Sequence, residues 1–426
     1  MQPYHEQDAA SLQAAYEAAK QAYQAFQKKG LSLDMSRGKP CKEQLDLSLP
    51  MLDLVGSTTS MLAENGMDIR NYGVLDGLPE AKRLFAEMLE VTPDMVFVGG
   101  NSSLNLMYDA IARAMTFGVL GSKPWSAYET IKFICPSPGY DRHFAITEHF
   151  GFELITVPMQ KDGPDMGLVK SLVENDPLIK GIWCVPHYSN PTGITYSDDV
   201  VRAFAALKPA APDFRIFWDN AYHMHHLSDT PDVLLNIFEA CAQAGSADMV
   251  FSFASTSKMT FSGAGISAFV ATPKNLQDAM KTITIQTIGF DKIAQLQHAR
   301  FFPSLDSMLA HMKKHQVLLA PKFDAVTNAI EKNLVPLGIA SYTKPNGGYF
   351  ISFDGLPGTA TRVHTLCKEA GLVMTDAGAP FPYGVDPEDK NLRIAPTLPP
   401  IEELCAAMEL FCLAVKMASL ELYLQQ

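Results

Sequence analysis

The sequence predicts an α/β protein built on a mainly parallel sheet, followed by a smaller α+β part. Between residues 130 and 270, short apolar runs alternate with helical stretches, which is typical of parallel strands buried on both faces. After about residue 300 the pattern changes to longer helices and to strands of alternating polarity. Polar side chains directly follow several apolar runs, at the strand ends where such sheets bind ligands.

Length and composition narrow the class of protein. A chain of 426 residues, 47% of them hydrophobic and 19% charged, is expected to form two or three globular domains. The formal net charge of -12 disfavours nucleic acids and anionic membranes as partners, because both need clustered cations. No apolar run is long enough to span a bilayer, so we expect no membrane contact.

The cysteines and the N-terminus bear on location. The seven cysteines are scattered without a CxxC pair, which indicates reduced thiols rather than a disulfide framework. The opening MQPYHEQDAASLQ lacks the basic start and apolar run of a signal peptide. We therefore expect a cytoplasmic protein.

A helix is expected over residues 9–29, followed by an extended segment. Its apolar side chains recur every three or four positions, and Gly30 is a suitable C-cap. The chain then runs extended to Pro40, because a residue that precedes proline disfavours helix. A Gly-rich turn at 71–80 opens a second helix over 79–89. The stripe of the first helix consists of Leu12, Tyr16, Ala19, Tyr23 and Phe26.

Seven strands are expected in the large part of the chain. The first, at 94–100, is followed by Asn-Ser-Ser at 101–103 and by a helix to about residue 115. Those small polar residues either present a helix N-terminus to a phosphate or form a simple helix cap. The other strands are expected at 131–135, 152–158, 181–186, 216–219, 249–254 and 266–272, with helices at 166–174, 197–207 and 232–242.

The C-terminal part predicts fewer and shorter strands. We expect helices at 308–333, 360–370 and 401–423, and strands at 347–353, near 373 and at 392–395. No internal repeat or low-complexity tract interrupts this order.

One lysine stands out at the end of an expected strand. Lys258 lies in residues 255–258 (STSK), between an apolar run and a small-residue loop. Burial there would lower the pKa of its ammonium and make the neutral amine available as a nucleophile. Taken alone, the same sequence is also typical of a surface lysine on a turn.

Two further motifs follow strand ends. Residues 189–193 (SNPTG) form a tight turn in which Asn190 could offer its amide to a ligand. Asp219 and Tyr222 belong to DNAY after another apolar run, where the aspartate is either a helix cap or a buried counter-ion.

Together these motifs resemble the fold type I pyridoxal-phosphate (PLP) enzymes, specifically the class I/II aminotransferases. The resemblance extends from Arg37 to Arg393 and keeps the family's order of motifs: Tyr72, GGNSS, PGY, NPTG, DxAY, SxSK and NLRIAPT. The pattern STSK-x-TF-x-GAG is similar to a divergent, aspartate aminotransferase-like branch. The resemblance implies a large domain with a mainly parallel seven-stranded sheet, a smaller α+β domain, and a homodimer with shared active sites. We expect an N-terminal helix and arm at 1–50 that packs with the small domain, the large domain at 51–300 and the small domain at 301–426.

The resemblance also implies a role for each motif in cofactor chemistry. Lys258 would hold pyridoxal 5'-phosphate as an internal aldimine and act as the base between Cα and C4′. Asp219 would pair with the pyridine nitrogen. Asn190 and Tyr222 would hydrogen-bond the phenolic oxygen, and Tyr140 would stack on the ring.

The family's phosphate cup is carried over with one departure. Its donors here would be Asn101, Ser102, Ser103 and Ser255, with Tyr72 reaching in from a neighbouring subunit. Most relatives carry an arginine eight residues after the lysine, where this chain has Ile266. Either another cation substitutes, or amide and hydroxyl donors suffice.

For the substrate, the resemblance assigns the α-carboxylate to Arg393, with Asn190 and the backbone of Gly38 beside it. Arg37 and Lys39 flank Gly38, and they either receive a second carboxylate or are solvated surface charges. We expect transfer of the amino group of aspartate to 2-oxoglutarate. The alternatives are a PLP-dependent C–S or β-lyase and, less favoured, a non-enzymatic cofactor sensor.

Other motifs are given ordinary explanations. Residues 223–226 (HMHH) lack HExxH and any matching cysteine spacing, so we interpret His223, His225 and His226 as loop or entrance residues and expect no metal site. Gly263 and Gly265 form only a fragment of a dinucleotide fingerprint.

Overall fold

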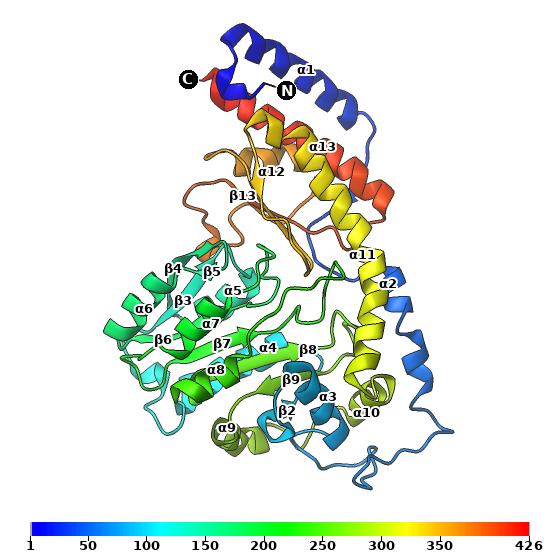
Figure 1. Ribbon diagram of the computed structural model, residues 1–426, viewed down its shortest axis with the longest axis vertical. Coiled ribbons are helices and arrows are strands. Elements are labelled where there is room, and N and C mark those ends of the chain that lie inside the picture. The colour runs from blue at the N-terminus through cyan, green and yellow to red at the C-terminus, as the bar shows by residue number, and fades with distance from the viewer. Residues whose placement is uncertain (1, 426) are drawn as a thin grey trace.

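The computed structural model describes residues 2–425 and contains one large sheet (Figure 1). Its strand order is β2-β9-β8-β7-β6-β3-β4-β5. The strands are β2 (Val96–Val98), β3 (Lys132–Ser137), β4 (Glu153–Gln160), β5 (Gly163–Pro164), β6 (Ile179–Cys184), β7 (Arg215–Asp219), β8 (Val250–Ser255) and β9 (Ser267–Val270).

The pairing confirms the mainly parallel α/β architecture. Strands β3, β4, β6, β7 and β8 pair in parallel, whereas β9 runs antiparallel to both β8 and β2. All seven strands expected from the sequence are present. The sheet has an eighth, β5, which the sequence did not indicate because it is only a two-residue antiparallel extension of β4.

Helices cover both faces of this sheet (Figure 1). The core of one face includes side chains of α4 (Ser103–Phe117), α5 (Asp141–His149) and α9 (Pro273–Gln286). The core of the other includes side chains of α3 (Pro79–Leu89), α6 (Met166–Asn175), α7 (Asp198–Ala205), α8 (Ile237–Ala244) and α10 (Lys292–Phe301). Helix α8 starts at Ile237 rather than at 232, because the Asn236 side chain caps it there.

A second, smaller unit has its own core. The three-stranded sheet β10-β11-β13 packs with long helices, and a two-residue pair joins β1 to β12. Its elements are β1 (Leu33–Asp34), β10 (Ser341–Tyr342), β11 (Ile351–Asp354), β12 (Leu372–Val373), β13 (Asn391–Ile394), α11 (Leu305–Asn333), α12 (Ala360–Glu369) and α13 (Ile401–Leu424).

The N-terminal helix α1 (Ala9–Gln27) belongs to this smaller unit. Leu12, Ala19, Tyr23 and Phe26 are buried in the same core as α13, and both chain ends lie at the top of Figure 1. The short α2 (Lys42–Asp46) then lies beside α11 (Figure 1). The division at residues 50 and 300 stays a prediction, and its outermost residues, Met1 and Gln426, lie outside the described range.

Two observations concern membrane-spanning helices and the cysteines. None of the helices in residues 2–425 is both long and apolar enough to cross a bilayer. All seven cysteines are unpaired, and only Cys405 is exposed.

Candidate active site

Five of the polar residues singled out in the sequence lie at or beyond the carboxyl ends of strands that share one direction: Asn101, Tyr140, Asn190, Asp219 and Lys258. They line a cavity of about 380 Å³. A neighbouring cavity of about 540 Å³ shares several of these residues and reaches the smaller unit. The first cavity is lined by Gly38, Asn101, Ser102, Ser103, Tyr140, Asn190, Asp219, Tyr222, Ser255 and Lys258, among others, and the second adds Arg37 and Arg393.

Lys258 is the nucleophile candidate in this cavity. It follows β8, and its Nζ lies 4.9 Å from the centre of the Tyr222 ring. Burial lowers the pKa of the Lys258 amine, while the charge of Asp219 acts in the opposite direction. The net lowering leaves more neutral amine than a surface lysine would have.

Asp219 forms a hydrogen bond with a histidine side chain through one of its carboxylate oxygens. It ends β7 and is 2% exposed, and its Oδ2 lies 3.0 Å from His143 Nε2. The His143 ring stacks on Trp183, with ring centroids 4.6 Å apart. The second carboxylate oxygen, Oδ1, is buried and has no hydrogen-bond partner among the described residues. A buried carboxylate oxygen without a donor is costly, so this atom is suited to receive one from a ligand.

Hydroxyl groups gather at another part of the cavity. Ser102 precedes α4, and its side chain makes no capping hydrogen bond, so the hydroxyl and the helix N-terminus are both available. Ser257 Oγ donates to the Asn101 carbonyl (3.0 Å) and Ser262 Oγ to the Ser257 carbonyl (2.7 Å), which closes the loop around this end. Such an arrangement is suited to an anion.

The position of the usual arginine is part of the core. Ile266 is 1% exposed, and its backbone pairs with Thr256. Among the described residues that line the 380 Å³ cavity, only Lys39 and Lys258 are cationic. The same cavity is lined by the amide of Asn101 and by the hydroxyl groups of Ser102, Ser103 and Ser255.

Aromatic rings form the remaining walls. Burial raises the pKa of Tyr140 to about 12 and that of Tyr222 well above its ordinary value, so both phenols stay protonated and can donate. Tyr222 is 3% exposed and stacks at 5.8 Å on Tyr349.

Arg393 brings the smaller unit into the site. It lies on β13 and is 7% exposed, with its guanidinium 4.9 Å from the centre of the Phe350 ring. Its Nη1 donates to Asp141 Oδ1 (2.7 Å) and to Asn190 Oδ1 (3.4 Å), and its Nη2 donates to Thr375 Oγ1 (3.4 Å). An arginine so placed can receive a carboxylate.

The segment before α2 supplies the third wall. A Cβ at Gly38 would lie 2.5 Å from Phe350 Cζ, so only glycine fits there. Arg37 and Lys39 on either side are exposed and make no ion pair within residues 2–425. The Lys39 carbonyl accepts from Thr397 Oγ1 (2.9 Å), which fixes this segment on the smaller unit.

Comparison with known proteins identifies the family. The sequence matches the aspartate aminotransferase family over residues 6–426. It is 46% identical over 417 residues to the aspartate aminotransferase of Corynebacterium glutamicum, covering 98% of this chain and 96% of that one. The chain belongs to the aspartate aminotransferase family. The aminotransferase class predicted from the motifs is confirmed.

Solved structures support the same assignment. The crystal structure of an aspartate transaminase from C. glutamicum superposes with a TM-score of 0.96 at 46% identity, covering 98% of each chain. The α-aminoadipate aminotransferase of Thermus thermophilus, complexed with N-(5'-phosphopyridoxyl)-L-leucine, gives a TM-score of 0.74 at 17% identity over 92% of this chain and 93% of that one. The latter likeness concerns the fold alone.

Tyr72 and the histidines at 223–226, which were singled out in the sequence, line neither of the two cavities. Tyr72 is 78% exposed and lines neither cavity. Of the three histidines expected at a loop or entrance, His225 is buried, and burial lowers the pKa of all three. Within residues 2–425, no set of three or more His, Cys, Asp or Glu side chains is arranged to hold a metal ion.

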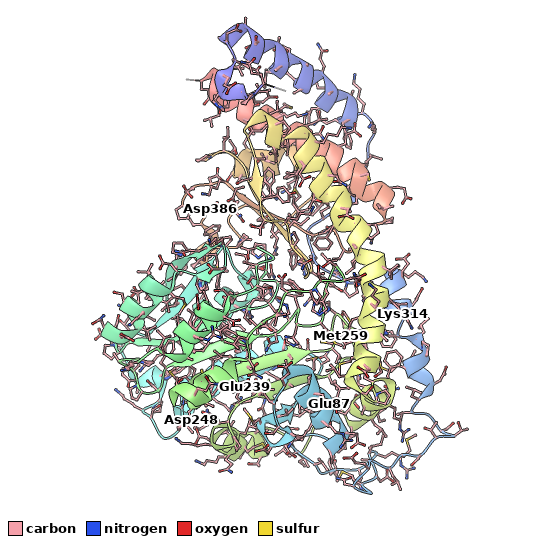
Figure 2. All side chains as sticks on the ribbon, in the orientation of Figure 1. Glu87, Glu239, Asp248, Met259, Lys314 and Asp386 are labelled. Carbon is pink, nitrogen blue, oxygen red and sulfur yellow. The ribbon has the colours of Figure 1, made fainter. Side chains whose placement is uncertain are left out.

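The sequence missed the residues that hold the Lys258 turn of this aminotransferase. The Tyr349 hydroxyl donates to the Lys258 carbonyl (3.3 Å) and accepts from Gln44 Nε2 (2.9 Å). His311 Nε2 lies 2.8 Å from the carbonyl oxygen of Met259, which is labelled beside α11 in Figure 2. His298 lies below the turn and contacts two of its hydroxyl groups. Its Nδ1 faces the Ala294 carbonyl and is therefore the nitrogen that donates. Its Nε2 is then free to accept from the hydroxyls of Thr256 (3.0 Å) and Thr260 (2.8 Å). These contacts join segments far apart in sequence, so no local pattern signals them.

Proposed function

We propose that this chain binds pyridoxal 5'-phosphate and transfers the amino group of L-aspartate to 2-oxoglutarate. The observation that carries the proposal is the buried, unpartnered Oδ1 of Asp219 in a cavity that also holds the Lys258 amine. A protonated pyridine nitrogen would supply the missing donor. The hydroxyl groups and helix N-terminus beside Ser102 offer the neutral donors that a phosphate needs.

The residues of the cavity can be assigned to parts of this cofactor. Asp219 would hold the ring nitrogen, Asn190 and Tyr222 the phenolic oxygen, and Tyr140 the ring face. The phosphate would lie among Asn101, Ser102, Ser103 and Ser255. When bound, the cofactor supplies an electron sink that stabilises the carbanion at the substrate Cα.

The proton at the substrate Cα would be moved by a side chain of the protein itself. The Lys258 amine would hold the cofactor, and its neutral Nζ would accept the proton from the substrate Cα. Burial of Lys258 favours this neutral form. The Asn190 Oδ1 accepts from Arg393, so its Nδ2 is free to donate toward the cavity.

The substrate proposal depends on cations at two sites. Arg393 would take the α-carboxylate, with Gly38 leaving room for it. Arg37, which lines the 540 Å³ cavity and makes no ion pair within residues 2–425, would take the second carboxylate of aspartate. The C. glutamicum relative, named aspartate aminotransferase, supports this choice at 46% identity.

An absorbance screen of amino acids against the purified holoenzyme tests the proposal. We expect aspartate to convert the cofactor to its amino form and 2-oxoglutarate to restore it, in ping-pong fashion. Borohydride reduction and peptide mapping should place the cofactor on Lys258, with Lys258→Ala as the unlabelled control. Release of pyruvate and ammonia instead of amino transfer would indicate the lyase alternative. A protein that stays unlabelled contradicts the proposal altogether.

The role of Arg37 has its own test. Loss of a charge-assisted hydrogen bond of roughly 1.5–3 kcal/mol should lower kcat/KM for aspartate about tenfold to hundredfold in Arg37→Ala. The value for alanine, which has no second carboxylate, should change far less. Lys39→Ala tests the other cation of the segment in the same assay. Equal losses for aspartate and alanine would remove Arg37 from this role.

We also propose a cytoplasmic homodimer with shared sites. Tyr72, Ile285 and Ile288 are exposed by 78%, 85% and 62% in the single chain, which is typical of surfaces that a partner covers. Unpaired, mostly buried cysteines fit a reducing compartment. Sedimentation of the purified protein at micromolar concentration should give twice the mass of one chain.

A further inference from the structure

Arg393, the proposed α-carboxylate ligand, already has a carboxylate bound. Asp141 Oδ1 lies 2.7 Å from Arg393 Nη1, and the two side chains are 32% and 7% exposed. Among residues 2–425, Asp141 has no other side-chain partner, and both residues line the 540 Å³ cavity. A carboxylate of the protein itself therefore lies within hydrogen-bonding distance of Arg393.

Arg393 makes its side-chain hydrogen bonds through its two terminal nitrogens. A bidentate pair needs two parallel N–H groups on one edge of the guanidinium. Nε is buried on a side chain that packs over Phe350, and the hydrogen bonds of this guanidinium to other side chains come from Nη1 and Nη2. On the edge formed by Nη1 and Nη2, Asp141 is the charged partner, and it lies closer to Nη1 than Asn190 does. A substrate carboxylate that pairs with this edge meets the Asp141 carboxylate at Nη1.

The charge of Asp141 would still be stabilised if its side chain moved away from Arg393. It is the first residue of α5, where the unpaired N–H groups and the helix dipole stabilise a carboxylate. Its exposed fraction of 32% leaves it in contact with water. Leaving Arg393 therefore does not strand the charge in an apolar environment.

We propose that Asp141 is a resident ligand of Arg393 that competes with the substrate carboxylate and weakens ground-state binding. The inference rests on the proposed function, since it assigns Arg393 to the substrate. In the free enzyme, Asp141 neutralises the buried guanidinium, which would be costly to leave unpaired. On binding, the substrate exchanges one carboxylate for another, so only the difference between them contributes to affinity.

The test measures binding of succinate, a dicarboxylate that cannot react, to the holoenzyme by calorimetry. Asp141→Asn keeps the shape and an oxygen acceptor but removes the charge, and Asp141→Ala removes both. We expect both variants to bind succinate more tightly, by roughly threefold to tenfold, and to show a lower KM for aspartate. Asp376→Asn is the matched control, because Asp376 lines the same cavity, is 92% exposed and does not contact Arg393. Its binding of succinate should stay within about twofold of the wild type.

Unchanged or weaker succinate binding in Asp141→Asn would overturn the inference. Weaker binding in Asp141→Ala alone would also overturn it, since that outcome assigns Asp141 to orienting Arg393. Equal tightening in Asp376→Asn would show general electrostatics instead of competition, and would overturn it as well. Amino transfer is measured in the same samples. Failure of the proposed function would appear as absent transfer in every protein, including the wild type.

Discussion

At the scale of single residues, the site depends on Asp219, a buried carboxylate in which only one of the two oxygens has a hydrogen-bond partner among the described residues. One oxygen of Asp219 contacts His143, and the other is the one that we propose to bind the ring nitrogen of the cofactor. A hydrogen bond to a charged group contributes roughly 1.5–3 kcal/mol. We therefore expect His143→Ala to lower kcat about tenfold to hundredfold and to weaken cofactor binding, with little change in KM. His149→Ala, on the exposed end of the same helix, is the control and should leave both unchanged.

The same measurements distinguish positioning from folding. A His143→Ala protein that loses thermal stability but binds the cofactor normally would contradict the assigned role.

The Lys258 amine should titrate below an ordinary lysine. Burial lowers its pKa, so the neutral amine is present at lower pH. We expect the rate at which the apoprotein attaches pyridoxal phosphate to rise with pH and to level off below about pH 10.4, the usual lysine pKa. Because Asp219 raises the pKa of Lys258, the plateau in Asp219→Asn should move to still lower pH. Stopped-flow absorbance measures both curves, and a plateau at or above the usual value would contradict the assignment.

At the scale of elements, the turn that carries Lys258 is held by α2, α10 and α11. Tyr349 donates to the Lys258 carbonyl and links it to Gln44 on α2. A neutral hydrogen bond contributes about 0.5–1.5 kcal/mol, so Tyr349→Phe should lower kcat roughly twofold to tenfold at nearly constant KM. Tyr342→Phe removes a hydroxyl bonded to Glu331 on the smaller unit and should leave kcat unchanged. Equal kcat in the two variants would show that the hydroxyl of Tyr349 does not position the turn.

Most elements could be predicted from the sequence because each carries its own periodic pattern. The buried strands around Phe217 and Phe251 are short apolar runs, and α1 and α13 have long amphipathic or apolar repeats. Helices α2, α5, α9 and α10 were missed. Helix α5 mixes polar and apolar residues over only nine positions, and α9 ends in the β-prone run TITI.

Some residues of the candidate site could be predicted from the sequence, and others could not. Lys258, Asp219 and Asn190 follow strands, so chain order and strand direction place them together. The contacts of Gln44 and His143 do not follow from any local pattern. Gln44 meets Tyr349 across 305 positions, and such a pair is determined only by the packing of the two units.

At the scale of the whole molecule, the site joins parts of both units. The large unit supplies Lys258 and Asp219, and the smaller unit supplies Arg393 and Thr375. The arm before α2 contributes Gly38, and through Gln44 it also contacts the Lys258 turn. The proposed substrate contacts at Gly38 and Arg393 and the position of the Lys258 amine therefore depend on the same arrangement of the two units.

A partner chain would complete this arrangement, and the position of Tyr72 allows a strict test. Because Tyr72 lines neither cavity of its own chain, it can contribute to catalysis only across a dimer interface. We expect Tyr72→Ala to lose roughly tenfold in kcat, as for one hydrogen bond to a charged phosphate, and Lys258→Ala to be inactive. Hybrid dimers of the two variants, purified through two different affinity tags, should regain about half of the wild-type activity. One of their sites then combines Lys258 of one chain with Tyr72 of the other. If Tyr72 acted within its own chain, no site of the hybrid would be intact and activity would stay at or below that of Tyr72→Ala.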